Sequence, residues 1–154
     1  FTDYTLPGAV DYFEFLSMEF LPHVEAEFNI DPDNRTIVGS SLGGLFTTLA
    51  VFLDYRTTPL FKRYWSYDAS LFLHPTETET LIQERLSRST VFSGNLHQTS
   101  ALQNGNHQFV SQWIQNFEQK SFSGLTMTFE SYNVSHIGAA SASFRPSLIQ
   151  AYGG

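Results

Sequence analysis

The stretch Thr36-Ile37-Val38-Gly39-Ser40-Ser41-Leu42-Gly43-Gly44 decides the fold class of this chain. It begins with the β-branched apolar run 36–39, which is typical of a strand buried on both faces. The residues 42–53 that follow are apolar or small and predict a helix. Between such a strand and such a helix, Gly39-x-Ser41-x-Gly43 fits the G-x-S-x-G turn, which projects a serine hydroxyl above the sheet. Ser41 is therefore the candidate nucleophile, and the backbone N–H of Leu42 is the candidate oxyanion donor.

The rest of the chain continues this alternation of strands and helices. Further helices are predicted over residues 6–28, 80–86, 107–120 and 139–152, with Pro22 and Pro146 as disturbances, and further strands over 64–67, 90–93 and 125–132. Strands that alternate with helices predict an α/β fold with a mainly parallel sheet, in which the last strand lies close to an edge. No linker or repeat interrupts the pattern, so a single domain over residues 1–154 is expected.

Composition narrows the class of protein further. The 154 residues are 42% hydrophobic and 15% charged, and the formal net charge is −7. An acidic chain of this kind is not expected to bind nucleic acid or an anionic membrane surface, both of which attract basic proteins. No apolar run reaches the roughly 18 residues that a membrane span needs, so we expect a soluble chain, cytoplasmic or periplasmic. The absence of cysteine excludes a thiol nucleophile but does not fix the compartment.

A serine nucleophile needs a base, and the chain order on this type of fold is serine, acid, histidine. Of the five histidines, His136 follows the last predicted strand and precedes the last helix, where a base could reach the serine. His23 precedes the candidate nucleophile, and His107 opens an amphipathic helix, so both are interpreted as surface residues. His136 is the candidate general base.

The acid is harder to assign. No Asp or Glu occurs between Glu84 and Glu118, so the segment after the strand 90–93 supplies none. Asp68, just after the strand 64–67, keeps the expected order and is the candidate acid. The alternatives are a neutral orienting group, Asn95 or His97, or a serine–histidine dyad without an acid. A carboxylate oxygen of Asp68 within about 3.2 Å of a ring nitrogen of His136 would distinguish the triad from the dyad.

The sequence predicts neither a metal nor a cofactor. The histidines are scattered, with no H-x-x-x-H or H-E-x-x-H pair to ligate zinc. The glycines after Ser41 are not followed by the lysine of a P-loop, and no G-x-G-x-x-G fingerprint is present.

Three segments of the chain resemble one known family. The stretches 15–25, 29–36 and 39–45 resemble the serine esterases of the esterase D type, an α/β-hydrolase group that includes siderophore (enterobactin-type) esterases. Ser70-Leu71-Phe72 is similar to the Ser-Leu-Trp of the group's Ser-Pro-Ser-Leu-Trp segment, and 135–138 is similar to its histidine loop. The chain departs from the group at Ser40, where a histidine is usual, and at His97, where relatives carry an acid.

The resemblance implies a three-layer α/β-hydrolase sandwich, of which this chain covers only the C-terminal part. Relatives carry further strands upstream, together with the loop that supplies a second oxyanion-hole N–H. We therefore expect either a fragment of a larger enzyme or a chain that pairs with a second copy. In the group, Asp68 falls where relatives carry a serine, and some members act through a dyad, which favours the dyad here.

The leading hypothesis is a serine carboxyl-ester hydrolase that acts on a small-molecule ester. Ser41 would attack the ester carbonyl, and His136 would remove and return the proton. Two alternatives remain open at this point. One is a non-catalytic α/β-hydrolase-like module that binds a ligand or partner, and the other is a thioesterase or peptidase on the same scaffold.

Overall fold

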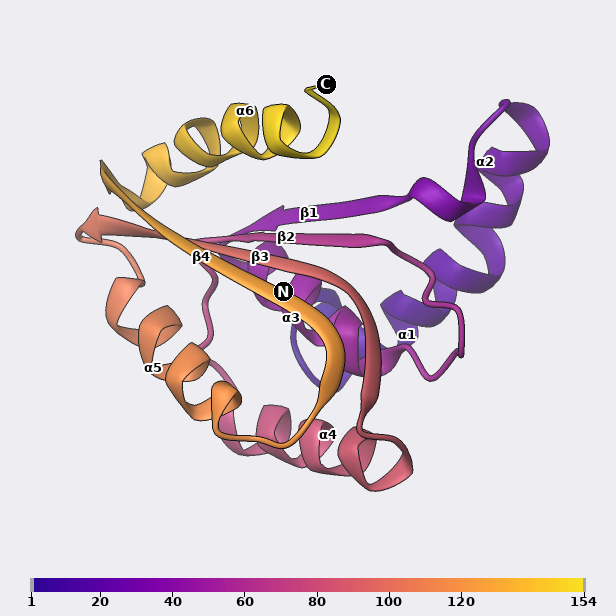
Figure 1. The fold of residues 1–154 in the computed structure, drawn as a ribbon, viewed down its shortest axis with the longest axis horizontal. Helices are drawn as coiled ribbons and strands as arrows, with labels where there is room; N and C mark the ends of the chain where they lie inside the picture. Colours follow the sequence, from indigo (N-terminus) through magenta and orange to yellow (C-terminus); the bar gives the residue numbers. More distant parts are fainter. Residues whose placement is uncertain (1, 154) are drawn as a thin grey trace.

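Four parallel strands form one sheet in the computed structural model, which describes residues 2–153 (Figure 1). The order in the sheet is β1 (Thr36–Ser40), β2 (Arg63–Tyr67), β3 (Val91–Gln103) and β4 (Ser123–Ser135). Val38 pairs with Trp65, Trp65 with His97, and His97 with Thr128. Because all four strands run the same way, their carboxyl ends meet at one edge of the sheet, where ligands bind in open α/β folds. The predicted α/β fold with a parallel sheet is confirmed.

Helices cover both faces of this sheet and give the molecule three layers. On one side lie α3 (Leu42–Leu53), α4 (Pro75–Arg88) and α5 (His107–Glu118), and on the other lies α6 (Ala139–Tyr152) (Figure 1). The main core fills the space between the sheet and the first group of helices. Phe52 and Phe117 are almost fully buried there, and their rings meet edge to face with centroids 5.3 Å apart. Apolar residues of the strands and of the helices therefore pack together in one core.

The N-terminal helical segment differs from the single kinked helix predicted over 6–28. A 3-10 turn (Thr2–Tyr4) comes first, and then α1 (Gly8–Phe15), a π-helical turn (Leu16–Phe20) and α2 (Leu21–Glu27). The N–H of Leu21 donates to the carbonyl of Leu16, five residues back. Pro22 has no N–H and its ring crowds the preceding turn, so the widened turn accommodates it where the prediction placed a kink. No helix among residues 2–153 is both long enough and apolar enough to cross a membrane.

Two element boundaries differ from the sequence prediction more than the others. The helix predicted over 80–86 is the longer α4, and the strand predicted over 90–93 continues as β3 to Gln103. The polar residues after Ser93 resemble a loop in the sequence, but the sheet pairs them on both sides. Gln98, for example, is fully buried and donates to Thr48 Oγ1 of α3 at 3.0 Å. Buried hydrogen-bond partners thus allow a polar segment to form an interior strand.

Candidate active site

Ser41 stands at the carboxyl edge of the sheet, between the last residue of β1 and the first residue of α3. Its backbone has φ 57° and ψ −116°, a conformation that a non-glycine residue rarely adopts. Gly39 makes the turn sterically possible, because a Cβ atom there would lie 2.1 Å from the carbonyl oxygen of Gly43. Gly44 lets α3 approach β2, since its Cβ would lie 3.1 Å from the carbonyl oxygen of Tyr67. Gly39 and Gly44 therefore have a direct steric reason to stand beside this serine, whereas a Cβ at Gly43 would meet open space.

The backbone of Ser41 is fixed by hydrogen bonds from three segments. Its N–H donates to the carbonyl of Tyr67 at 3.0 Å. Its carbonyl accepts from the N–H of Leu45 and from the N–H of Ser70, both at 3.0 Å. The strained turn is thereby held between the end of β2 and the first turn of α3, which is how such a conformation persists in a folded protein.

His136 approaches Ser41 from the far edge of the sheet. It begins a 3-10 turn (His136–Gly138) directly after β4, and its side chain is 37% exposed. Nε2 of the imidazole lies 3.1 Å from Ser41 Oγ. When the second ring nitrogen carries the proton, Nε2 accepts the hydroxyl hydrogen of Ser41, as a general base must.

Asp68 completes a chain of three side chains. Its Oδ2 lies 2.5 Å from Nδ1 of His136, which meets the distance criterion for an orienting carboxylate. The carboxylate is fully buried, and its Oδ1 accepts from the N–H of Ala101 and from the N–H of Asn106, both at 2.9 Å. The residue takes a positive φ of 43°, which turns it at the end of β2 across the end of β3. Because Oδ1 is occupied by two backbone donors, Oδ2 is left to face the imidazole.

The backbone N–H of Leu42 lies at the candidate oxyanion position. Leu42 is the first residue of α3, and the first N–H groups of a helix have no partner within the helix. These groups also lie at the positive end of the helix dipole. The arrangement can therefore stabilise negative charge that develops next to Ser41 Oγ.

Three supporting residues were not found from the sequence as parts of the site. Ser70 Oγ lies 3.3 Å from Ser41 Oγ, and the Ser70 side chain is almost fully buried. The backbone N–H groups of Ala101 and Asn106 donate to the Asp68 carboxylate, from the end of β3 and from the tight turn before α5, and the Asn106 side-chain amide also donates to the Asp68 carbonyl at 2.9 Å. Only Ser70 carries a signal in the sequence, its similarity to the Ser-Leu-Trp segment. A backbone N–H has no residue-type signature at all.

The neutral alternatives for the orienting group do not lie in a loop. Asn95 and His97 are both within β3, and His97 pairs along the sheet with Trp65 and Thr128. Nδ1 of His97 lies 2.8 Å from Thr128 Oγ1, and burial lowers the pKa of this imidazole. The predicted end of the strand at residue 93 is wrong, because β3 continues through this segment to Gln103. His97 is bound within the sheet by a partner of its own.

The remaining histidines lie apart from this chain of contacts. Nδ1 of His107 lies 2.8 Å from Ser100 Oγ, and the ring stacks on Phe129. His23 lies near Glu27 of its own helix α2, and His74, just before α4, lies near Glu77 in the first turn of that helix. Among residues 2–153, no group of three or more metal-ligating side chains is placed to hold an ion.

Comparison with known proteins gives a family match over part of the chain. A family model described as "Putative esterase" matches residues 4–67, from the first turn to the end of β2, and this range contains Ser41. No match was found among curated proteins.

Solved structures share the fold over almost the whole chain. The BES protein from Bacillus cereus has a TM-score of 0.74 and 22% identity, covering 95% of this chain and 60% of that one. The IroE-like serine hydrolase from Shewanella oneidensis has a TM-score of 0.68 and 20% identity, covering 95% of this chain and 54% of that one. The enterobactin and salmochelin hydrolase IroE has a TM-score of 0.66 and 23% identity, covering 99% of this chain and 62% of that one.

These matches confirm the resemblance to the siderophore-type serine esterases and the three-layer fold that the resemblance implied. The chain spans 54% to 62% of the length of these relatives.

Proposed function

We propose that this chain carries the nucleophile, base and acid of a serine carboxyl-ester hydrolase. The observation that carries the proposal is the continuous contact from Asp68 through His136 to Ser41, at 2.5 Å and 3.1 Å. Three residues far apart in sequence meet in the order that the reaction needs. The family match over 4–67 and the similarity to an enterobactin and salmochelin hydrolase support an ester as the substrate.

In the proposed reaction, Ser41 Oγ attacks the ester carbonyl while Nε2 of His136 takes the hydroxyl proton. The carbonyl oxygen becomes negative and receives the N–H of Leu42. His136 then protonates the departing alcohol, and an acyl group remains on Ser41. A water molecule, deprotonated by the same imidazole, hydrolyses this acyl-enzyme and restores the serine. Asp68 holds the imidazole in the tautomer whose Nε2 is free and stabilises the imidazolium that forms.

The strain at Ser41 supports a catalytic role over a purely binding one. A positive φ at a non-glycine residue costs on the order of 1–3 kcal/mol, and such residues cluster at functional sites. A module that only binds a ligand gains nothing from this strain, whereas a nucleophile gains a hydroxyl that the turn exposes above the sheet.

The test is hydrolysis of p-nitrophenyl acetate by the wild-type chain and by Ser41→Ala. We expect the variant to lose hydrolysis down to a residual rate of about 10³–10⁴ over water, with its circular dichroism unchanged. Ser87→Ala is a suitable control, because this exposed serine of α4 lies outside the site. Turnover by Ser41→Ala at the wild-type rate would remove Ser41 from the mechanism.

A further inference from the structure

A second hydroxyl lies beside the candidate nucleophile. Ser70 Oγ is 3.3 Å from Ser41 Oγ, and Ser70 is only 5% exposed. The N–H of Ser70 also donates to the carbonyl of Ser41 at 3.0 Å, so the two serines are joined through both backbone and side chain. Within residues 2–153, Ser41 Oγ is the one hydrogen-bond partner of the Ser70 hydroxyl. The orientation of this buried hydroxyl is therefore set by Ser41.

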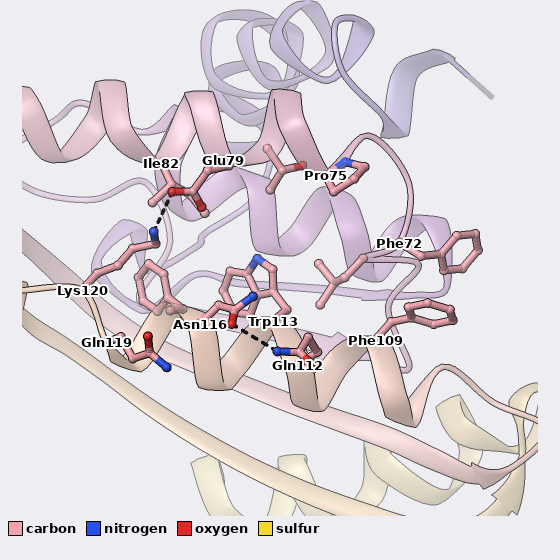
Figure 2. Close-up of a pocket in the computed structure, with 13 residues that line it drawn as sticks. Phe72, Pro75, Glu79, Ile82, Phe109, Gln112, Trp113, Asn116, Gln119 and Lys120 are labelled. Carbon is pink, nitrogen blue, oxygen red and sulfur yellow. Dashed lines mark hydrogen bonds and ion pairs between the residues drawn. The ribbon is translucent and has the colours of Figure 1, made fainter.

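The segment that carries Ser70 is fixed by its neighbours along the chain. Leu71 is packed in the core, and the carbonyl of Ser70 accepts from the N–H of Leu73 at 3.1 Å. Phe72 packs against Phe109 of α5, with ring centroids 5.0 Å apart (Figure 2). The Ser70 hydroxyl is thus held in place before any substrate binds, as a preorganised donor in an active site must be.

The other contacts of Ser41 decide which of the two serines donates. Nδ1 of His136 faces the carboxylate of Asp68, so the ring proton is on Nδ1 and Nε2 is free to accept. The single hydrogen of the Ser41 hydroxyl therefore points to Nε2, 3.1 Å away. The oxygen of Ser41 still has an acceptor lone pair, and the hydrogen of Ser70 is the donor that faces it. Ser70 is thus the donor, and Ser41 Oγ is the acceptor.

The strength of Ser41 Oγ as an acceptor changes during the proposed reaction. It is a hydroxyl oxygen in the free enzyme. In the acyl-enzyme it is the single-bonded oxygen of an ester, which accepts hydrogen bonds less well because the carbonyl withdraws its electron density. After water has attacked the acyl carbonyl, the C–Oγ bond breaks, its electron pair stays on Oγ, and His136 returns a proton there. A hydrogen bond from Ser70 therefore strengthens between the acyl-enzyme and this transition state, and interactions of that kind accelerate a step.

We propose that Ser70 is a catalytic residue for deacylation, in which its hydroxyl donates to Ser41 Oγ as that oxygen leaves the acyl group. The inference rests on the proposed function and adds a residue to it. In acylation the same donor makes the hydroxyl of Ser41 easier to deprotonate, but it also draws electron density from the attacking oxygen. These two effects offset each other, so Ser70 acts mainly on the second half of the reaction.

The test measures acylation and deacylation separately in the wild-type chain and in Ser70→Ala. With the protein in excess over p-nitrophenyl acetate, release of p-nitrophenol in a single turnover gives the acylation rate. Decay of the acetyl adduct on Ser41, followed by acid quenching and peptide mass spectrometry, gives the deacylation rate. We expect Ser70→Ala to lower the deacylation rate about fivefold more than the acylation rate, in the range of one neutral hydrogen bond, so that the acetyl adduct accumulates.

Two further variants separate the hydroxyl from the packing of the residue. Ser70→Thr keeps the hydroxyl and should restore the wild-type ratio of the two rates. Ser147→Ala is the matched control, because Ser147 is also a buried serine and its Oγ donates to the carbonyl of Ser143 within α6. It should leave both rates unchanged.

Acetylation of Ser41 in the wild-type chain supports the proposed function, and the two rates of Ser70→Ala then decide the role of Ser70. Equal losses in both steps would mean that Ser70 donates to the carbonyl oxygen of the substrate. A larger loss in acylation would mean that Ser70 only orients the resting hydroxyl of Ser41. Either result, or no loss in either step, overturns the inference. A wild-type chain that forms no acetyl adduct on Ser41 refutes the proposed function, and the inference falls with it.

Discussion

Replacing Asp68 with asparagine tests the orientation of the base in a way that the structure makes specific. Oδ1 of Asp68 accepts from the N–H of Ala101 and from the N–H of Asn106. In Asp68→Asn these two donors hold the amide oxygen at the same position, so the amide nitrogen must take the place of Oδ2. An NH₂ group would then face Nδ1 of His136, and a donor there favours the tautomer with the proton on Nε2. That tautomer cannot accept the proton of Ser41.

The expected magnitude follows from this wrong tautomer. The equivalent change in serine proteases lowers kcat about 10⁴-fold, which corresponds to about 5.4 kcal/mol in the activation barrier. A dyad, in which the base needs no carboxylate, would lose less than about tenfold, or roughly 1.4 kcal/mol. The two mechanisms therefore differ by about three orders of magnitude in one measurement.

The assay is the kcat for p-nitrophenyl acetate, measured with substrate in excess over KM. Asp54→Asn provides a matched control, since Asp54 is also a buried carboxylate and accepts from the N–H of Leu60 at 2.5 Å. The control should lower the thermal midpoint without a comparable loss of kcat. If Asp68→Asn keeps more than a tenth of the wild-type kcat, the carboxylate does not orient His136 and the dyad is correct.

Three other predictions concern the base, a buried histidine and the serine turn. His136→Ala should remove most of the rate, because Ser41 then has no base to take its proton. If His97→Ala does so instead, the base is misassigned. Burial lowers the pKa of His97, so the unfolded chain binds this proton more readily and stability should fall as pH drops below about 6.5. His97→Gln should reduce the fall of the thermal midpoint with decreasing pH, whereas the control His23→Gln, at an exposed histidine, should not. An equal dependence of the thermal midpoint on pH in both variants would contradict the role of His97. Gly39→Ala should abolish soluble expression, because the new Cβ would overlap the backbone of Gly43. The control Gly43→Ala places its Cβ in open space and should fold. A stable Gly39→Ala protein would contradict the steric argument.

The serine turn could be predicted because all its requirements lie within nine consecutive residues. A β-branched strand, two flanking glycines and a helix start are local features, and Gly39 and Ser41 have the steric roles that the motif assigns to them. The predicted burial of this strand on both faces is wrong, because β1 is an outer strand of the described sheet and Val38 is 45% exposed. The position of His136 after the last strand could be predicted for a similar reason, since the order of parallel strands brings their carboxyl ends together.

The contact between Asp68 and His136 could not be predicted with the same certainty. The two residues end β2 and follow β4, and β3 lies between these strands in the sheet. Asp68 reaches across β3 only because of its positive φ and the N–H groups of Ala101 and Asn106. The full length of β3 could not be predicted from the sequence for a related reason. Its polar side chains, such as Gln98, form their hydrogen bonds with residues of other layers, and these contacts exist only in the folded structure.

Labelling of the wild-type chain with a fluorophosphonate, followed by peptide mass spectrometry, tests the central claim most directly. Such a probe reacts with a serine hydroxyl that a neighbouring base activates. We predict one adduct per chain, located on Ser41, that forms much more slowly in His136→Ala and does not form in Ser41→Ala. A folded wild-type chain that gains no mass, or gains it on another serine, would contradict the account and favour a non-catalytic binding module.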